Sequence, residues 1–194
     1  VALLYGGSAV GGVVNATDNR IPKEKLDGIT GRVDGSIGGA DSQNNLAVVI
    51  DVGTDVLAIH ADAYTRKTSD LDIPSYAVSS RKARADGTPR ESRGKLVNSS
   101  ANAEGGALGA SFIFDNGYLG TSYSGVRSNY GTVAEEAVRA DMRSDRVDVA
   151  TEFRELSTVV RRVKARMAYT DYQHQEIEDG AAGTTFKNEG VEGS

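Results

Sequence analysis

The chain has 194 residues, no cysteine, only two histidines and a formal net charge of −5. The lack of cysteine excludes thiol catalysis, disulfides and Cys-ligated zinc, and two histidines cannot build a His-rich metal cage. No basic stripe is interleaved with aromatic residues, so we expect no nucleic acid partner. No apolar run reaches the about 18–20 residues of a membrane-spanning helix, but a membrane-spanning β-strand needs only about 9–11 residues with one apolar face.

The first 22 residues differ in composition from the rest, because they are rich in glycine and apolar residues. The pairs Gly6-Gly7 and Gly11-Gly12 match neither a dinucleotide-binding fingerprint nor a P-loop, so we expect them in turns and close packing. We predict three parts: residues 1–22, a linker over 23–28, and strands over 29–194. Residues 1–22 should not join the strands as a hairpin neighbour. Both termini read as cuts through a longer protein.

From about residue 29 onward, apolar and polar residues alternate with the period of a β-strand. Helical spacing is weak there. The sequence predicts seven strands, at about 29–37, 45–52, 55–66, 104–115, 118–124, 145–154 and 159–172, and an eighth that begins near Thr185. Because successive strand side chains point to opposite faces, each strand has one apolar and one polar side. Three apolar sets are expected on one face, the lipid side: residues 46/48/50/52, 57/59/61/63 and 147/149/151/153.

Short turns predict which residues pair. Gly53-Thr54 and Asn116-Gly117 suit two-residue hairpin turns. With these turns the apolar faces coincide, whereas a slip of one residue would place apolar residues opposite charges. The predicted partners are Ile50 with Leu57 and Val48 with Ile59 across the first turn, and Phe114 with Leu119 and Phe112 with Thr121 across the second.

The hairpin between the sixth and seventh strands should bring acidic and basic side chains together. With residues 156–158 as the turn, Lys164 is the one charge left without a partner, and it would present a positive charge to the interior. A slip of two residues stays open, because this turn has no diagnostic dipeptide. The predicted partners are Glu152 with Arg162, Asp148 with Arg166, and Lys164 with Ala150.

Long polar connections, at about 67–103, 125–144 and 173–184, alternate with the short turns. Short periplasmic turns and longer extracellular loops are typical of an up-and-down membrane barrel. We therefore predict an all-β fold, a fragment of an antiparallel up-and-down transmembrane β-barrel with about seven to eight strands. A soluble β-sandwich also alternates and is the alternative, although loops this long are uncommon in compact soluble domains.

The opening segment closely resembles the end of the plug domain of TonB-dependent outer-membrane receptors, where a Leu-Tyr-Gly turn precedes a glycine pair and a valine-rich strand ending in Asn. The matching residues are Leu4, Tyr5, Gly6, Gly11, Gly12 and Asn15. Residues 18–22 resemble the family's exit from plug to barrel. Later stretches resemble its strand ends in the same order, among them residues 64–70, 117–120 and 169–172.

The resemblance implies a 22-stranded barrel in the bacterial outer membrane, with its lumen filled by the plug. Residues 1–22 would be the end of that plug domain, and residues 29–194 the first barrel strands, in contact with outer-membrane lipid. Such receptors take up a scarce ligand, a metal or a metal chelate such as a siderophore. The TonB complex energises them through a segment that would lie upstream of Val1.

The pattern is nearest to the branch with zinc-uptake receptors, which carry a His- and acid-rich insertion in an extracellular loop. The matching loop here is residues 125–144, which offers Glu135, Glu136 and Asp141 but no histidine. This departure weakens a zinc assignment. Glu135 and Glu136 remain candidates for ligand contact.

Four further residues carry candidate chemistry. His60 and Asp62 share the polar side of the third strand, where a metal or proton role competes with a simple lumen-lining role. His174 lies beside Gln173 at a predicted loop edge and, like Lys164, is a candidate for ligand contact. No carboxylate pair is positioned as acid and base, and no nucleophile elbow occurs. We therefore predict no enzymatic activity, no cofactor and no tightly held metal.

Two other classes of function stay open. A passive porin-like channel would lack the plug sequence before its first strand. A soluble or surface β-domain for adhesion would not partition into the outer membrane. Six basic residues also make the second long connection cationic, which suits attraction of anionic chelates or lipid phosphates if the loop is more than a solvated one. They are Arg81, Lys82, Arg84, Arg90, Arg93 and Lys95.

Overall fold

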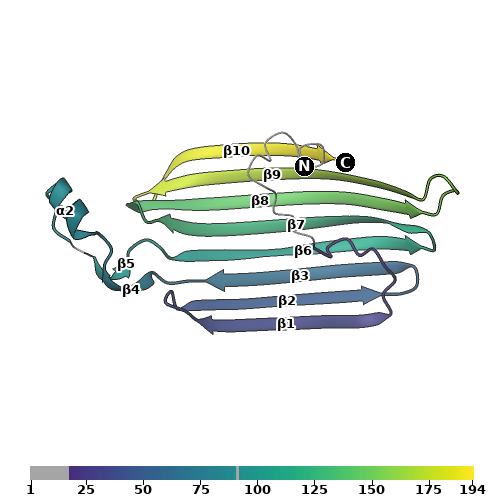
Figure 1. Ribbon diagram of the computed structural model, residues 1–194, viewed down its shortest axis with the longest axis horizontal. Helices are drawn as coiled ribbons and strands as arrows, with labels where there is room; N and C mark the ends of the chain where they lie inside the picture. Colours follow the sequence, from purple (N-terminus) through teal and green to yellow (C-terminus); the bar gives the residue numbers. More distant parts are fainter. Residues whose placement is uncertain (1–17, 91) are drawn as a thin grey trace.

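A single antiparallel sheet of eight strands dominates the computed structural model, which describes residues 18–90 and 92–194 (Figure 1). Its strand order is β1-β2-β3-β6-β7-β8-β9-β10, an up-and-down meander, so the predicted all-β fold class is confirmed. Within the described residues β1 and β10 are the two edges, and the sheet is not closed. The strands are β1 (Gly28–Gly38), β2 (Gln43–Gly53), β3 (Leu57–Lys67), β6 (Ala101–Phe114), β7 (Gly117–Thr132), β8 (Glu135–Arg154), β9 (Arg162–Glu178) and β10 (Ala181–Gly193).

The chain leaves the sheet once, between β3 and β6, and we call residues 68–100 the excursion. It contains β4 (Leu71–Tyr76) and β5 (Arg93–Leu96), which pair with each other, and the short helix α2 (Ser80–Asp86). These elements lie beyond one end of the large sheet (Figure 1). A long polar connection was predicted over about 67–103, and that prediction missed both the small sheet and the helix.

The ends of α2 explain why a helix forms here. The Ser79 hydroxyl accepts a hydrogen bond from the Lys82 backbone N–H at 3.2 Å, which caps the first turn. Gly87, in the left-handed conformation with φ 67°, ends the helix. Arg90 then stacks 4.1 Å above the Tyr76 ring and joins the helix region to β4. Outside the large sheet, a hydrogen bond from Lys95 to Asp72 raises the pKa of that lysine.

Strand pairing sorts the side chains into two faces. Directly paired residues share a face, and the pairs Val48–Ala63 and Leu119–Thr151 link the three predicted apolar sets through intervening strands. The prediction that these sets share one face is confirmed. We call it the apolar face. Its exposed members include Ile29, Val33, Ile50, Leu57, Leu108, Phe112, Leu119, Val147, Val149, Met167 and Val191.

The predicted strand pairings put each side chain on the correct face, but the pairs are shifted along the strands by an even number of residues. Across β2–β3, Ile50 pairs with Ala61 instead of Leu57, a shift of four residues. Across β6–β7, Phe114 pairs with Gly117 instead of Leu119, so the turn is residues 115–116. Even slips keep every side chain on its face, and the pattern of faces therefore cannot choose between them.

Two of the three predicted long connections are wrong. Residues 125–144 belong mostly to β7 and β8, which meet at a turn of residues 133–134, and residues 173–184 belong mostly to β9 and β10, with a turn at 179–180. Only the excursion is a long connection. Turn lengths therefore do not alternate as predicted, and the longest connection at the opposite end is residues 155–161.

Asn98 fastens the excursion to the β7–β8 hairpin. Its side-chain amide donates hydrogen bonds to the backbone carbonyls of Thr132, Glu135 and Val138, at 3.2, 3.0 and 2.6 Å. Its side-chain oxygen accepts from Arg139 at 3.1 Å. A buried amide with all of these partners closes the two-residue turn and ties it to the end of the excursion.

Within the described residues, no helix is long and apolar enough to cross a membrane.

Candidate functional site

The face opposite the apolar face, which we call the polar face, is crossed by the segment that precedes β1. Ile21 and Pro22 of this segment are buried, and Ile21 packs in one cluster with Ala58, Ile113 and Tyr118. Described residues 18–27 form no strand, so this part of residues 1–22 is not a hairpin neighbour of β1. The plug-end motif at Leu4, Tyr5, Gly6, Gly11, Gly12 and Asn15 lies outside the described residues.

Glycines in the sheet make room for this segment. A Cβ added to Gly109 would lie 1.6 Å from the carbonyl oxygen of Arg20, and one added to Gly120 would lie 2.4 Å from Ile21. A Cβ at Gly53 would meet Leu26 at 2.4 Å. Each of these positions therefore needs a residue without a side chain for the segment to lie so close to the sheet.

Asp62 links the segment to the sheet, and His60 lies behind it. Its Nδ1 is 2.8 Å from Asp51 and its Nε2 is 3.1 Å from Asp62, and its exposed fraction is 5%. Asp62 also accepts a hydrogen bond from the Arg20 guanidinium at 3.3 Å. The predicted pair His60 and Asp62 is thus brought together, in a hydrogen-bonded chain that runs from Asp51 to Arg20.

A second group of charges lies on β8 and β9. Asp148 is 2.7 Å from Arg166, and Glu152 is 3.2 Å from Arg162, so both predicted ion pairs form. The carboxylates are 7% and 4% exposed. Asp148 also contacts Arg146 at 2.9 Å. Buried carboxylates with several cationic partners hold their side chains in fixed positions along the polar face.

The predicted isolation of Lys164 is wrong. The register across β8–β9 is shifted by two residues, so Glu152 pairs directly with Lys164 and Ala150 with Arg166. The Lys164 ammonium lies 3.2 Å from Glu152. Lys164 therefore does not offer a free charge to a ligand, and the pair Glu152–Arg162 forms diagonally instead of directly across the strands.

His174 lies inside β9 instead of at a loop edge. It points to the polar face directly opposite Met142 of β8, and its ring centroid is 6.3 Å from that of Tyr130 and 6.0 Å from that of Phe186. Its Nε2 is buried and has no hydrogen-bond partner among the described residues. The side chain packs mainly against these aromatic neighbours. The strand pairing places His174 near the end of the sheet that carries the excursion.

Glu135 and Glu136 are exposed residues at the start of β8. Because residues 125–144 form strands and a tight turn, the acidic loop that motivated their selection is not present. Among residues 18–90 and 92–194, no group of three or more His, Cys, Asp or Glu side chains is arranged to hold a metal ion.

Sequence reasoning missed Asp51, Arg20 and Arg139. Asp51 follows the polar alternation of β2, and that signal could have identified it. Arg20 and Arg139 gave no signal, because their partners Asp62 and Ser100 are about forty residues away in the chain.

Comparison with known proteins shows a shared fold. No family model matches the chain. Among solved structures, it is similar to the copper transporter OprC, with a TM-score of 0.59 and 12% sequence identity. The match covers 79% of this chain and 21% of that protein, so the chain spans about a fifth of its length.

Proposed function

We propose that this chain is part of a bacterial outer-membrane receptor that takes up a scarce metal or metal chelate and is energised through the TonB complex. It would supply the end of the plug domain and the first strands of the barrel. It is not an enzyme and carries no cofactor. The apolar face would contact lipid, and the polar face would line the lumen. The likeness to a copper transporter supports a metal cargo.

One observation carries the proposal: a non-strand segment is packed by buried contacts against the polar face of an up-and-down sheet. Ile21 packs directly over Gly120, and Arg20 reaches the partly buried Asp62. The outward face is meanwhile lined by exposed Ile, Leu, Val and Phe. A large exposed apolar surface is unfavourable for a protein in water. On the lipid side of a membrane strand the same apolar residues are favourable, because a charged residue there would cost about 2–4 kcal/mol near the midplane. The segregation is the one that a filled membrane barrel needs.

A passive channel is the competing function, and the packed segment argues against it. Two cavities, of about 380 and 400 Å³, flank residues 18–23 on the polar face. The segment therefore occupies space that an open pore would leave to water. Movement of this segment, held by Arg20 and the His60 chain, is the step at which energy from TonB would act.

The test is uptake by cells that express the complete protein. Outer membranes are separated from inner membranes, the protein is located by immunoblotting, and uptake of radioactive copper, zinc and a ferric chelate is measured. We expect outer-membrane localisation and saturable uptake of one cargo that stops when TonB is deleted or the proton-motive force is dissipated. Uptake that continues without TonB would establish the passive channel instead, and a protein in the soluble fraction would refute both.

A further inference from the structure

The polar face of β6 and β7 carries a strip of small side chains, which we call the inner strip. The two strands place three directly paired couples there, and none of these residues is larger than serine. All of them are buried. At a strand spacing of about 4.8 Å, the inner strip is roughly 10 Å wide. In order toward the excursion, the couples are Ser111–Gly120, Gly109–Ser122 and Ala107–Ser124.

Charged side chains of the neighbouring strands border the inner strip. The residues paired with it on β3 include His60 and Asp62, and those on β8 include Asp148 and Arg146. The charges of these borders are paired, because Asp62 lies 3.3 Å from Arg20 and Asp148 lies 2.9 Å from Arg146. The inner strip is thus an uncharged floor between two charge-paired borders.

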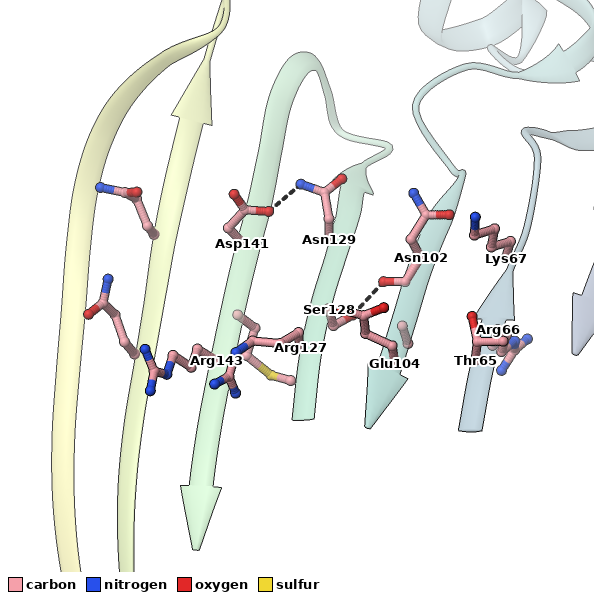
Figure 2. A pocket seen from close by; sticks show the side chains of 14 residues that line it. Thr65, Arg66, Lys67, Asn102, Glu104, Arg127, Ser128, Asn129, Asp141 and Arg143 are labelled. Atoms are coloured by element: carbon pink, nitrogen blue, oxygen red, sulfur yellow. Dashed lines mark hydrogen bonds between the residues drawn. The ribbon is translucent and has the colours of Figure 1, made fainter. Parts of the chain in front are cut away.

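The Ser111 hydroxyl is a buried polar group of the inner strip that lacks a partner. Ser111 is 1% exposed, and its hydroxyl makes no hydrogen bond within residues 18–90 and 92–194. The hydroxyl lies over Gly120, since a Cβ built on that glycine would clash with it. By contrast, Ser128, farther along β7, donates to the backbone oxygen of Asn102 at 3.3 Å (Figure 2). An unpaired buried hydroxyl is unfavourable, and water or a hydrogen-bonding solute would satisfy it.

The inner strip is covered at both ends. Toward the excursion, a Cβ built on Gly105 would lie 2.8 Å from the Tyr64 ring, so this ring covers the next glycine of β6. At the other end, the backbone of Arg20 covers Gly109, and Ile21 covers Gly120. A tyrosine side chain can rotate, and residues 20 and 21 belong to no strand. Both covers can therefore move away without breaking the pairing of the sheet.

We propose that the inner strip is the passage along the barrel wall for a compact polar cargo. Residues 20 and 21 block its inner end, and Tyr64 narrows its outer end. Selectivity in transporters follows from the width of the pathway and from the donors and acceptors that line it. Serine hydroxyls on a floor two strands wide suit a hydrated metal ion or a small hydrophilic chelate. The inference rests on the proposed function and assigns the route, which that function leaves open.

Uptake by cells that express the complete protein tests the passage. Ser124→Leu narrows the inner strip away from Gly109 and Gly120, and Ala110→Leu is its control, because Ala110 pairs with Ile59 on the apolar face. The probes are radioactive copper, zinc and a ferric chelate. For the probe that the wild type takes up, we expect the maximal rate to fall about tenfold in Ser124→Leu and less than about twofold in Ala110→Leu. Tryptic cleavage after Arg20 should stay as slow as in the wild type, because the segment remains docked.

Thiol labelling tests whether the inner strip opens. This chain has no cysteine, so Ser111→Cys introduces a single thiol into it, and any cysteine elsewhere in the complete protein is replaced by serine. Cells are treated with a small cationic methanethiosulfonate while they take up the probe. We expect this thiol to react at least about tenfold faster with TonB than without it, and the labelled protein to lose uptake. Ala110→Cys is the control, and its labelling should neither depend on TonB nor stop uptake.

Equal uptake by Ser124→Leu and Ala110→Leu, or equal labelling of Ser111→Cys with and without TonB, would overturn the inference. If Ser124→Leu does not reach the outer membrane, the labelling result decides alone. Either negative result leaves the proposed function standing while the wild type shows uptake that requires TonB. A wild type that takes up no probe, or does so without TonB, would instead remove the proposed function and the passage with it.

Discussion

Replacing Gly109 by alanine should release the segment of residues 18–27 from the sheet. The added Cβ would lie 1.6 Å from the Arg20 carbonyl oxygen, whereas the closest ordinary C···O contacts are about 3.3 Å, so the segment must move by roughly 2 Å. Ile21 and Pro22 are buried there, and burial of an apolar side chain contributes about 1.5–3 kcal/mol. A loss of about 2.8 kcal/mol raises the population of the released state about 100-fold.

Trypsin measures this population, because it must lift the segment to cut the bond after Arg20. The detergent-solubilised complete protein is digested briefly, and the rate of that cleavage is followed by mass spectrometry. When opening is fast relative to cleavage, the rate follows the released population. Gly190→Ala is the matched control, since Gly190 is also a strand glycine but a Cβ there meets nothing within 4 Å. Equal cleavage rates for Gly109→Ala and Gly190→Ala would show that the close contact does not hold the segment.

Three other substitutions test separate contacts. Asp62→Asn removes the carboxylate shared by His60 and Arg20, so cleavage after Arg20 should accelerate about tenfold or more, while exposed Asp55→Asn should leave it unchanged. Glu152→Gln leaves three basic side chains without their common carboxylate, so it should lower the free energy of unfolding by about 1–3 kcal/mol, measured by gel shift during urea titration. A loss no greater than that caused by Glu155→Gln would contradict the role of this cluster. Asn98→Ala leaves three backbone carbonyls without their donor, so proteolysis within the excursion should accelerate about tenfold relative to wild type and to Asn44→Ala, and unaltered digestion would argue against the fastening.

The alternation of apolar and polar residues predicted the sheet well, because one side of each strand had to be apolar. Leu46 to Val52 and Val147 to Phe153 show this pattern clearly, and their face is confirmed. The same pattern could not set the register, since slips of two or four residues preserve the faces. The turn at Asp115-Asn116 lies one residue before the Asn-Gly pair that was expected to form it.

The predicted loops failed for a related reason. The outward side chains of β8 between residues 139 and 145 are Arg139, Asp141, Arg143 and Asp145, whereas the inward ones include Ala140 and Met142. The apolar residues therefore change faces within this strand, and the charged stretch resembles a loop. His60 and Asp62 could be found because they follow one strand's period. Their partners Asp51 and Arg20 come from other elements, and only the folded chain brings them within hydrogen-bond distance.

The unequal lengths of the strands give the sheet a slanted rim. At about 3.3 Å per residue, β8 with 20 residues extends roughly 66 Å, whereas β1 with 11 extends roughly 36 Å. Followed through the register, β8 passes the ends of β1 by five residues (135–139) on the side of the excursion and by four (151–154) on the other side. In a bilayer with a hydrocarbon core about 30 Å thick, the β7–β8 hairpin would therefore project roughly 16 Å beyond β1 on the side of the excursion, and a solute would reach the lumen most directly over β1 and β2.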